Sequence, residues 1–112
     1  LKDAPVITFN AKDRLQTRWA EKALGVAATG PSHWFPSSHA FIDAAIAGLG
    51  WGMNPEHLAA KALASGQLRE ILPGQFLDVP LYWHVSRVVA GVTKPLTESV
   101  LQAANTVLRP IA

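Results

Sequence analysis

The side chains in this sequence that are suited to binding a ligand fall into two short clusters. They are Asn10, Lys12, Asp13, Ser37 and Ser38. The first three follow the hydrophobic run 5–9 and the two serines follow the run 33–36, so each cluster opens a predicted helix. Backbone N–H groups at a helix start favour a carboxylate, serine hydroxyls add donors, and the Asp13 carboxylate attracts an amino group. Together they predict a site for a small ligand that carries both groups.

The serine cluster also has two interpretations that need no ligand. Ser37 and Ser38 can simply cap the helix that follows them. The sequence Ser37–His39 can also suggest a nucleophile beside a base, but no Gly-x-Ser-x-Gly elbow surrounds it, and adjacent residues in a helix cap point in different directions. No two carboxylates form an obvious acid–base pair. We therefore expect no catalytic residue, and a protein that is not an enzyme.

The sequence also lacks the patterns of a metal or cofactor site. The four histidines do not fall at helical metal-binding spacing, and there is no cysteine, whereas zinc needs three or four convergent ligands. The run Gly48–Gly52 invites comparison with a dinucleotide fingerprint. That fingerprint follows a strand and opens a helix, whereas this run follows a predicted helix and opens a strand. We therefore expect neither a metal nor a cofactor.

Length and composition indicate one small globular domain or a part of one. The chain has 112 residues, 49% of them apolar, and a formal net charge of +2. Its basic residues are scattered rather than gathered on one face, as nucleic-acid binding normally requires. No apolar run approaches the ~20 residues of a membrane helix, and the lack of cysteine is compatible with the cytoplasm. The first residues resemble the middle of a longer chain rather than a signal peptide.

Hydrophobic periodicity predicts that strands alternate with helices along most of the chain. The predicted strands are 5–9, 33–36, 51–53, 68–72 and 79–85. The predicted helices are 12–24, 38–49, 55–64 and 95–108. Gly25 is expected to end the first helix, and Asn54 is expected to cap the third, with Pro55 as its first residue.

This order of elements predicts an α/β fold with a mostly parallel sheet and helices on both faces. In such sheets, ligands bind outside the carboxyl ends of the strands, where the helix N-termini point. The two polar clusters lie at such positions, at 10–13 and at 37–38. The fold prediction and the site prediction therefore agree.

Four segments of the sequence resemble, in the same order, the effector domain of LysR-type transcriptional regulators. They are Pro5–Gln16, Pro36–Pro55, Leu63–Leu68 and Leu81–His84. The second of them contains the stretches Ser-Ser-His-Ala-Phe and Gly-Leu-Gly-Trp-Gly-Met-Asn-Pro. The resemblance is strongest to the ArgP/LysG subgroup, also known as chromosome-initiation inhibitors, and it spans nearly the whole chain.

The resemblance implies a sensory role. Regulators of this family join an N-terminal winged helix-turn-helix to an effector domain of two α/β lobes, similar to type II periplasmic binding proteins. Residues 1–87 would be the second lobe, and 88–112 the returning loop and the C-terminal helix, which normally packs on the first lobe. DNA would be bound only through the N-terminal part, which lies outside this sequence. Effectors in the subgroup are the basic amino acids lysine and arginine, and the regulated genes include their exporters.

Carried over residue by residue, the loop at Asn10, Lys12 and Asp13 and the helix start at Ser37 and Ser38 would line the second-lobe side of the effector cleft. The protein would then be a cytoplasmic homo-oligomer without contact to a membrane. The apolar stripe of the last predicted helix agrees with assembly: with its partner lobe outside the chain, it is expected to dock on its own lobe or swap into a second copy.

Two other classes of protein stay open at this point. A lobe of a periplasmic solute-binding protein shares the fold; a signal peptide upstream would support it, and a helix-turn-helix would exclude it. A small α/β enzyme is the second alternative, and loss of an activity on substitution of Ser38 or His39 would favour it.

Overall fold

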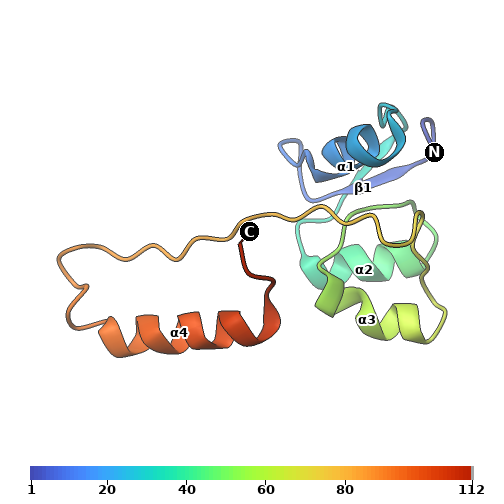
Figure 1. The fold of residues 1–112 in the computed structure, drawn as a ribbon. Helices are drawn as coiled ribbons and strands as arrows, with labels where there is room; N and C mark the ends of the chain where they lie inside the picture. Colours follow the sequence, from blue (N-terminus) through green and yellow to red (C-terminus); the bar gives the residue numbers. More distant parts are fainter. Residues whose placement is uncertain (112) are drawn as a thin grey trace. The chain divides into compact units, whose positions relative to one another are not determined.

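The computed structural model describes residues 1–111, which divide into two units, Leu1–Leu77 and a second unit that begins at Asp78. The first unit is built around the strand β1, Val6–Thr8, which pairs in parallel with β2, Ser32–Trp34 (Figure 1). The other edge of β1 forms a single bridge to Trp51. Its backbone is therefore hydrogen-bonded on both sides, with Val6 N donating to Pro31 O at 2.8 Å and Ile7 N to Trp51 O at 2.7 Å.

Three helices follow the strands of the first unit. They are α1, Leu15–Leu24; α2, Ser38–Ile46; and α3, Glu56–Ala64. Gly25 ends α1 in the left-handed conformation, with φ of 64°, as predicted, and Gly48 follows α2 with φ of 81°. A residue without a Cβ adopts positive φ at little cost in free energy. This explains why glycines occupy these two positions after the helices.

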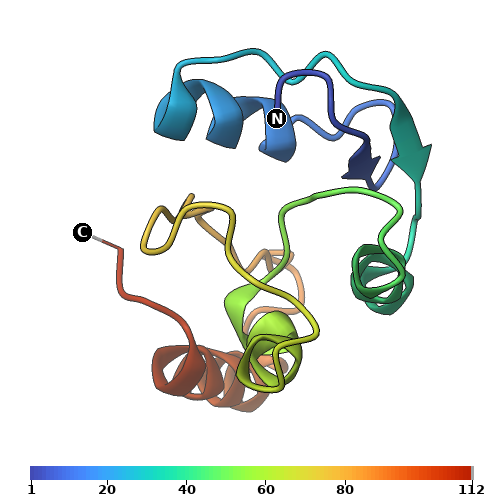
Figure 2. The ribbon, with the colours of Figure 1, turned by 90° about the vertical axis from the view of Figure 1, so that its right-hand side faces the viewer.

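The two faces of β1 are covered by different helices (Figures 1 and 2). Successive residues of a strand point to opposite faces. Ile7 is completely buried and packs against Phe41 and Ala44 of α2 to form the hydrophobic core. Val6 and Thr8 point to the opposite face, towards α1. Burial of a side chain such as Ile7 contributes about 1.5–3 kcal/mol, so this small core is a main source of stability.

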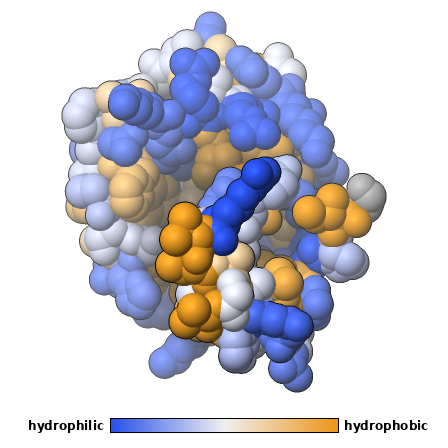
Figure 3. Space-filling view, turned by 90° about the vertical axis from the view of Figure 1, so that its left-hand side faces the viewer, coloured by the Kyte–Doolittle hydropathy of each residue, from blue (hydrophilic) through white to orange (hydrophobic). Residues whose placement is uncertain are grey.

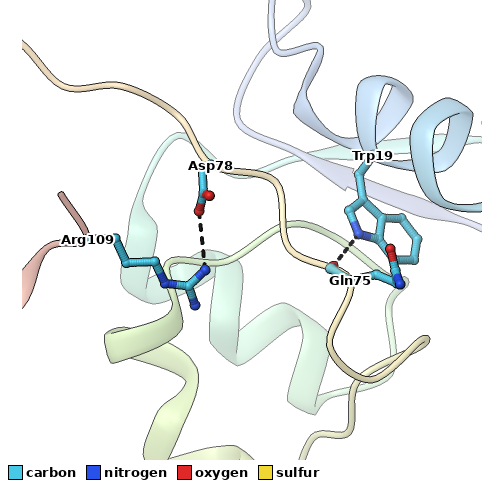
Figure 4. A network of polar contacts seen from close by, with 4 residues as sticks. All are labelled: Trp19, Gln75, Asp78 and Arg109. Atoms are coloured by element: carbon cyan, nitrogen blue, oxygen red, sulfur yellow. Dashed lines mark hydrogen bonds and ion pairs between the residues drawn. The ribbon is translucent and has the colours of Figure 1, made fainter. Parts of the chain in front are cut away.

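The tryptophan Trp19 connects α1 to two later parts of the first unit. Its ring lies 5.7 Å from that of Trp51, tilted by 53°. Its Nε1 donates a hydrogen bond of 2.7 Å to the carbonyl oxygen of Gln75 (Figure 4). Since Trp19 is only 4% exposed, this bond satisfies a buried donor and fixes the segment after α3.

The second unit consists of an extended segment and the helix α4, Lys94–Val107. Trp83 Nε1 donates to Thr97 Oγ1 at 3.1 Å, and the Arg109 guanidinium lies 3.3 Å from the Asp78 carboxylate (Figure 4). None of the residues of α4 is buried, although its apolar side chains form a stripe. Within the part of the chain that is described, no helix has the length and apolar character needed to cross a membrane.

The prediction of an α/β chain is confirmed, but the sheet is smaller than predicted. Residues 68–72 and 79–85 form no strand, and 51–53 contributes only the bridge at Trp51. A strand needs a neighbour for its backbone hydrogen bonds. Leu81 and Tyr82 are 68% and 70% exposed, so segment 79–85 has the composition of a strand without a sheet edge beside it in its unit.

The starts of two helices also differ from the prediction. The first helix begins at Leu15 rather than at Lys12, because residues 9–13 are held in a turn by the Asp13 side chain. In the third helix, Pro55 rather than Asn54 is the N-cap, with ψ of 131°. The proline is thus extended, and the helix begins one residue later.

Gly50 provides a test of how tightly β1 is enclosed. A Cβ at this position would lie 2.5 Å from the carbonyl oxygen of Pro5, which accepts the hydrogen bond of Trp51 N. We expect Gly50→Ala to lower the free energy of unfolding in urea by about 1–3 kcal/mol, because backbone has to shift. The control Gly91→Ala meets nothing within 4 Å and is expected to be neutral or slightly stabilising. Equal effects of the two substitutions would contradict this account.

Candidate functional site

A pocket of about 280 Å³ lies on the face of the sheet opposite α2. Its walls come from β1, the loop 10–13, the first turn of α1, Ala28 and β2. It therefore opens at the carboxyl end of β1, where parallel α/β folds bind their ligands. Its volume is near the lower limit for ligand sites, which begin at about 300 Å³. It suits a small molecule or one half of a larger site.

Asp13 holds the loop between β1 and α1 in shape. Its Oδ2 accepts a hydrogen bond of 2.9 Å from Phe9 N, and its Oδ1 accepts one of 3.0 Å from Leu15 N. The carboxylate thus caps the start of α1, where a negative charge complements the helix dipole. A carboxylate has about four acceptor positions, so two remain for a ligand. Asp13 is half-buried and lines the pocket, as the prediction of an amino-binding group requires.

The other predicted residues of this loop are exposed. Asn10 lines the pocket, and its Oδ1 accepts a hydrogen bond of 2.8 Å from Lys12 N. This bond is an Asx turn, which keeps the loop tight. Lys12 is not among the residues that line the pocket. The structure therefore brings Asn10 and Asp13 together and leaves the Lys12 side chain outside.

The two predicted serines lie at the start of α2 and are not among the residues that line this pocket. Ser37 is the N-cap, and its Oγ accepts a hydrogen bond from Ala40 N at 3.4 Å. Ser38 is the first helical residue, and both serines are exposed. Capping by Ser37 is thus confirmed, while a ligand contact of either serine stays a prediction.

Among the pocket residues that were not predicted from the sequence, two are polar and buried. Thr8 is 9% exposed and Gln16 only 2% exposed, and both line the pocket. Thr8 Oγ1 and both amide atoms of Gln16 are buried and have no hydrogen-bond partner among the described residues 1–111. A buried polar group without a partner lowers the free energy of unfolding by about 1–3 kcal/mol. Three such atoms at one pocket therefore destabilise a small domain noticeably.

The sequence did contain a signal for Gln16. It precedes Trp19 by three residues and Ala20 by four, and these three are the buried residues of α1. Residues at this spacing share one face of a helix. The apolar Leu15, which precedes Trp19 by four residues, is only half-buried. A polar residue in phase with buried neighbours is the pattern that identifies such a position.

A second, smaller hollow of about 210 Å³ lies between α2 and α3. It is lined by His39, Ile42, Asp43 and Leu58. His39 and Asp43 are four residues apart on α2 and both are exposed. Among residues 1–111, no three histidine, cysteine, aspartate or glutamate side chains lie close enough together to hold a metal ion.

The sequence matches a known family over almost the whole chain. The family described as LysR substrate binding domain matches residues 1–107. This chain belongs to that family. It is 44% identical over 105 residues to the transcriptional regulator ArgP of Pseudomonas aeruginosa, and 41% identical over 106 residues to the regulator LysG of Mycobacterium tuberculosis. These matches cover 94% and 95% of this chain but 35% of each relative, so the chain spans about a third of their length.

Solved structures of the family share the fold. The C-terminal domains of a LysR family protein from Agrobacterium tumefaciens superpose with a TM-score of 0.94 at 48% identity, covering 99% of this chain and 54% of that one. Full-length LysG from Corynebacterium glutamicum, with bound effector Arg, superposes with a TM-score of 0.71 at 31% identity. That match covers 97% of this chain and 38% of LysG.

The unpartnered groups of this LysR substrate binding domain lead to a prediction for its stability. Gln16→Leu and Thr8→Val replace a buried polar group by an apolar one of similar size. We expect each to leave the free energy of unfolding unchanged or to raise it by about 1 kcal/mol, because no hydrogen bond is lost. The measurement is urea unfolding followed by tryptophan fluorescence. Ile7→Val, on the other face of the same strand, is the contrast and is expected to cost about 0.5–1.5 kcal/mol. A loss larger than that for Gln16→Leu would show that its amide has a partner.

Proposed function

We propose that this chain is the effector-sensing part of a LysR-type transcriptional regulator and that its effector is a basic amino acid, arginine or lysine. The observation that carries the proposal is a polar pocket at the carboxyl end of β1 in a chain of the LysR substrate binding domain family. The ArgP and LysG names of its relatives and the Arg bound to LysG support this ligand class. The regulated genes would serve amino-acid export or metabolism.

The charges of the pocket support an amino-acid ligand. Asp13 is half-buried, so its charge is less screened than that of a fully exposed carboxylate and attracts an ammonium or guanidinium group. Arg14 lines the same pocket and is exposed, so it is available to a ligand carboxylate. In this proposal the Asn10 amide adds hydrogen bonds to the part of the ligand between its two charged groups. In this proposal Lys12, Ser37 and Ser38 contribute from the rim of the complete cleft.

We further propose that residues 1–87 form the second lobe of a two-lobed, periplasmic-binding-protein-like effector domain. The large share of the Agrobacterium tumefaciens C-terminal domains that lies beyond the match supports a second lobe outside this sequence. Residues 88–112 would be the returning loop and C-terminal helix that pack on that lobe. The exposed apolar stripe of α4 supports this role, because such a stripe is normally covered.

In this proposal the ligand acts by a shift of populations rather than by catalysis. A ligand bound between two lobes favours the arrangement in which both lobes contact it, in proportion to its differential affinity. The coupling to DNA binding is reciprocal, since DNA that favours the same arrangement tightens ligand binding. DNA itself would be bound through a segment outside these residues. The protein would act in the cytoplasm, where both DNA and free amino acids are present.

The proposal is tested by calorimetry on the chain and on a chimaera. Arginine and lysine are expected to bind the isolated chain more weakly than micromolar, because it supplies half of the cleft. A chimaera in which this chain replaces the matching segment of LysG from Corynebacterium glutamicum is expected to bind arginine. Asp13→Asn in the chimaera is expected to weaken binding about tenfold, the loss of one charged contact.

The matched control is Asp43→Asn, which removes an exposed carboxylate on α2 outside this pocket. Circular dichroism of each variant checks folding, because the Asp13 carboxylate also accepts the hydrogen bonds of Phe9 N and Leu15 N. A folded chimaera without affinity for arginine or lysine would contradict the ligand class. Micromolar affinity of the isolated chain would contradict the proposal that it supplies only half of the cleft.

A separate prediction concerns assembly through α4. Figure 3 views the molecule from the side of the loop before α4 and shows hydrophobic residues exposed among hydrophilic ones. In this loop, Val88 and Val92 are 92% and 86% exposed. We expect the isolated chain to dimerise through this loop and the apolar stripe of α4. Its mass measured by light scattering should then rise with concentration. Leu101→Glu on the stripe is expected to leave a monomer, whereas Gln102→Glu, the same charge one residue away, has no effect. A monomeric parent chain at high concentration would refute this.

A further inference from the structure

The floor of the pocket is formed by two polar side chains that neither sequence motif includes. Thr8 comes from β1, on the face opposite the core residue Ile7, and Gln16 comes from the buried face of α1. Both are more than nine-tenths buried, and both line the pocket. They belong to elements that meet only when the chain folds, so the pair is a product of the tertiary structure.

Neither side chain has a structural role that explains its polarity. Thr8 Oγ1, Gln16 Nε2 and Gln16 Oε1 make no hydrogen bond to any of residues 1–111, and a leucine or valine would fill the same space without unpaired atoms. Most buried polar side chains are hydrogen-bonded, so unpaired ones ask for an explanation. Because both line one pocket beside Asp13, a ligand with complementary groups is the explanation that the geometry offers.

The available groups define the chemistry of that ligand. Gln16 Oε1 and Thr8 Oγ1 are acceptors, and the half-buried charged residue beside them is the carboxylate Asp13. A guanidinium carries five N–H donors and an ammonium three, and neither has an acceptor. The cation that would contribute to a carboxylate site, Arg14, is exposed on the rim instead. The floor therefore fits a cationic head, and the rim fits a carboxylate.

We infer that Gln16 and Thr8 form the subsite for the cationic head of a basic amino-acid effector, with Asp13 supplying the charge, and this inference rests on the proposed function. Gln16 is thus a specificity-determining residue. Its amide is shielded from solvent in this structure, so it turns towards the head by rotation about its side-chain bonds. A neutral head of the same shape would leave the Asp13 charge uncompensated.

The test is a nuclear magnetic resonance titration of the 112-residue chain, which detects the weak binding expected of half a cleft. Three probes are used: arginine; agmatine, which lacks the carboxylate; and citrulline, whose head is neutral. Arginine and agmatine are expected to shift the side-chain amide resonances of Gln16. Citrulline is expected to bind about tenfold more weakly than arginine, because it loses the charge-assisted hydrogen bonds.

Substitutions then assign the effect to the two residues. Gln16→Leu is expected to weaken arginine and agmatine by a similar factor of about ten and to weaken citrulline less, because hydrogen bonds to a charged head are stronger than those to a neutral one. Thr8→Val is a second variant with the same expected pattern and keeps the test independent of how well Gln16→Leu folds. Gln102→Leu, on the exposed surface of α4, is the matched control and is expected to change nothing.

The outcomes separate this subsite from the proposed function. If Gln16→Leu weakens arginine but not agmatine, Gln16 binds the carboxylate end and the assignment is wrong. If arginine shifts the resonances of the loop 10–13 while neither variant changes its affinity, the subsite is overturned and amino-acid sensing stands. If no probe shifts any resonance of the folded chain at tens of millimolar, the subsite and the ligand class fall together.

Discussion

The organisation of the first unit depends on a three-residue strand that is hydrogen-bonded along both edges. β1 pairs with β2 on one side and with Trp51 on the other, so its backbone is satisfied while it is buried. Buried backbone groups must be paired, and this pairing places β1 at the centre. Its alternation then assigns Ile7 to the core with α2 and Thr8 to the pocket with α1. One short strand thus determines both the position of the hydrophobic core and the position of the pocket.

The two faces of β1 differ in the polarity of the side chains that they bury. The face towards α2 is apolar and closely packed, as expected for a core. The face towards α1 retains unpaired polar atoms on Thr8 and Gln16, which an apolar pair would avoid. The tie from Trp19 to Gln75 and the ring contact with Trp51 hold α1 in place above this face.

Much of the architecture was predictable from local patterns. The strand of β1, the helices and the left-handed glycine at the end of α1 follow from hydrophobic period and from glycine chemistry, which act over a few residues. The segments 68–72 and 79–85 were wrongly predicted as strands, because strand composition says nothing about whether an edge is available to pair with. Asp13 was predicted as a ligand group, but its role in shaping the loop through Phe9 N and Leu15 N appears only in the fold.

Of the two polar clusters in the sequence, 10–13 and 37–38, only the first contributes residues to the pocket. The sequence by itself determined the family, through ordered motifs, and the presence of Asn10 and Asp13 after a buried strand. Only the tertiary structure decided that these two residues share a pocket with Thr8 and Gln16, while Ser37 caps α2 and does not line that pocket. The physical reason is that motifs are read along the chain, whereas a pocket is formed by the faces of elements that meet in space. The burial of Gln16 exists only after folding, so no local pattern states it directly.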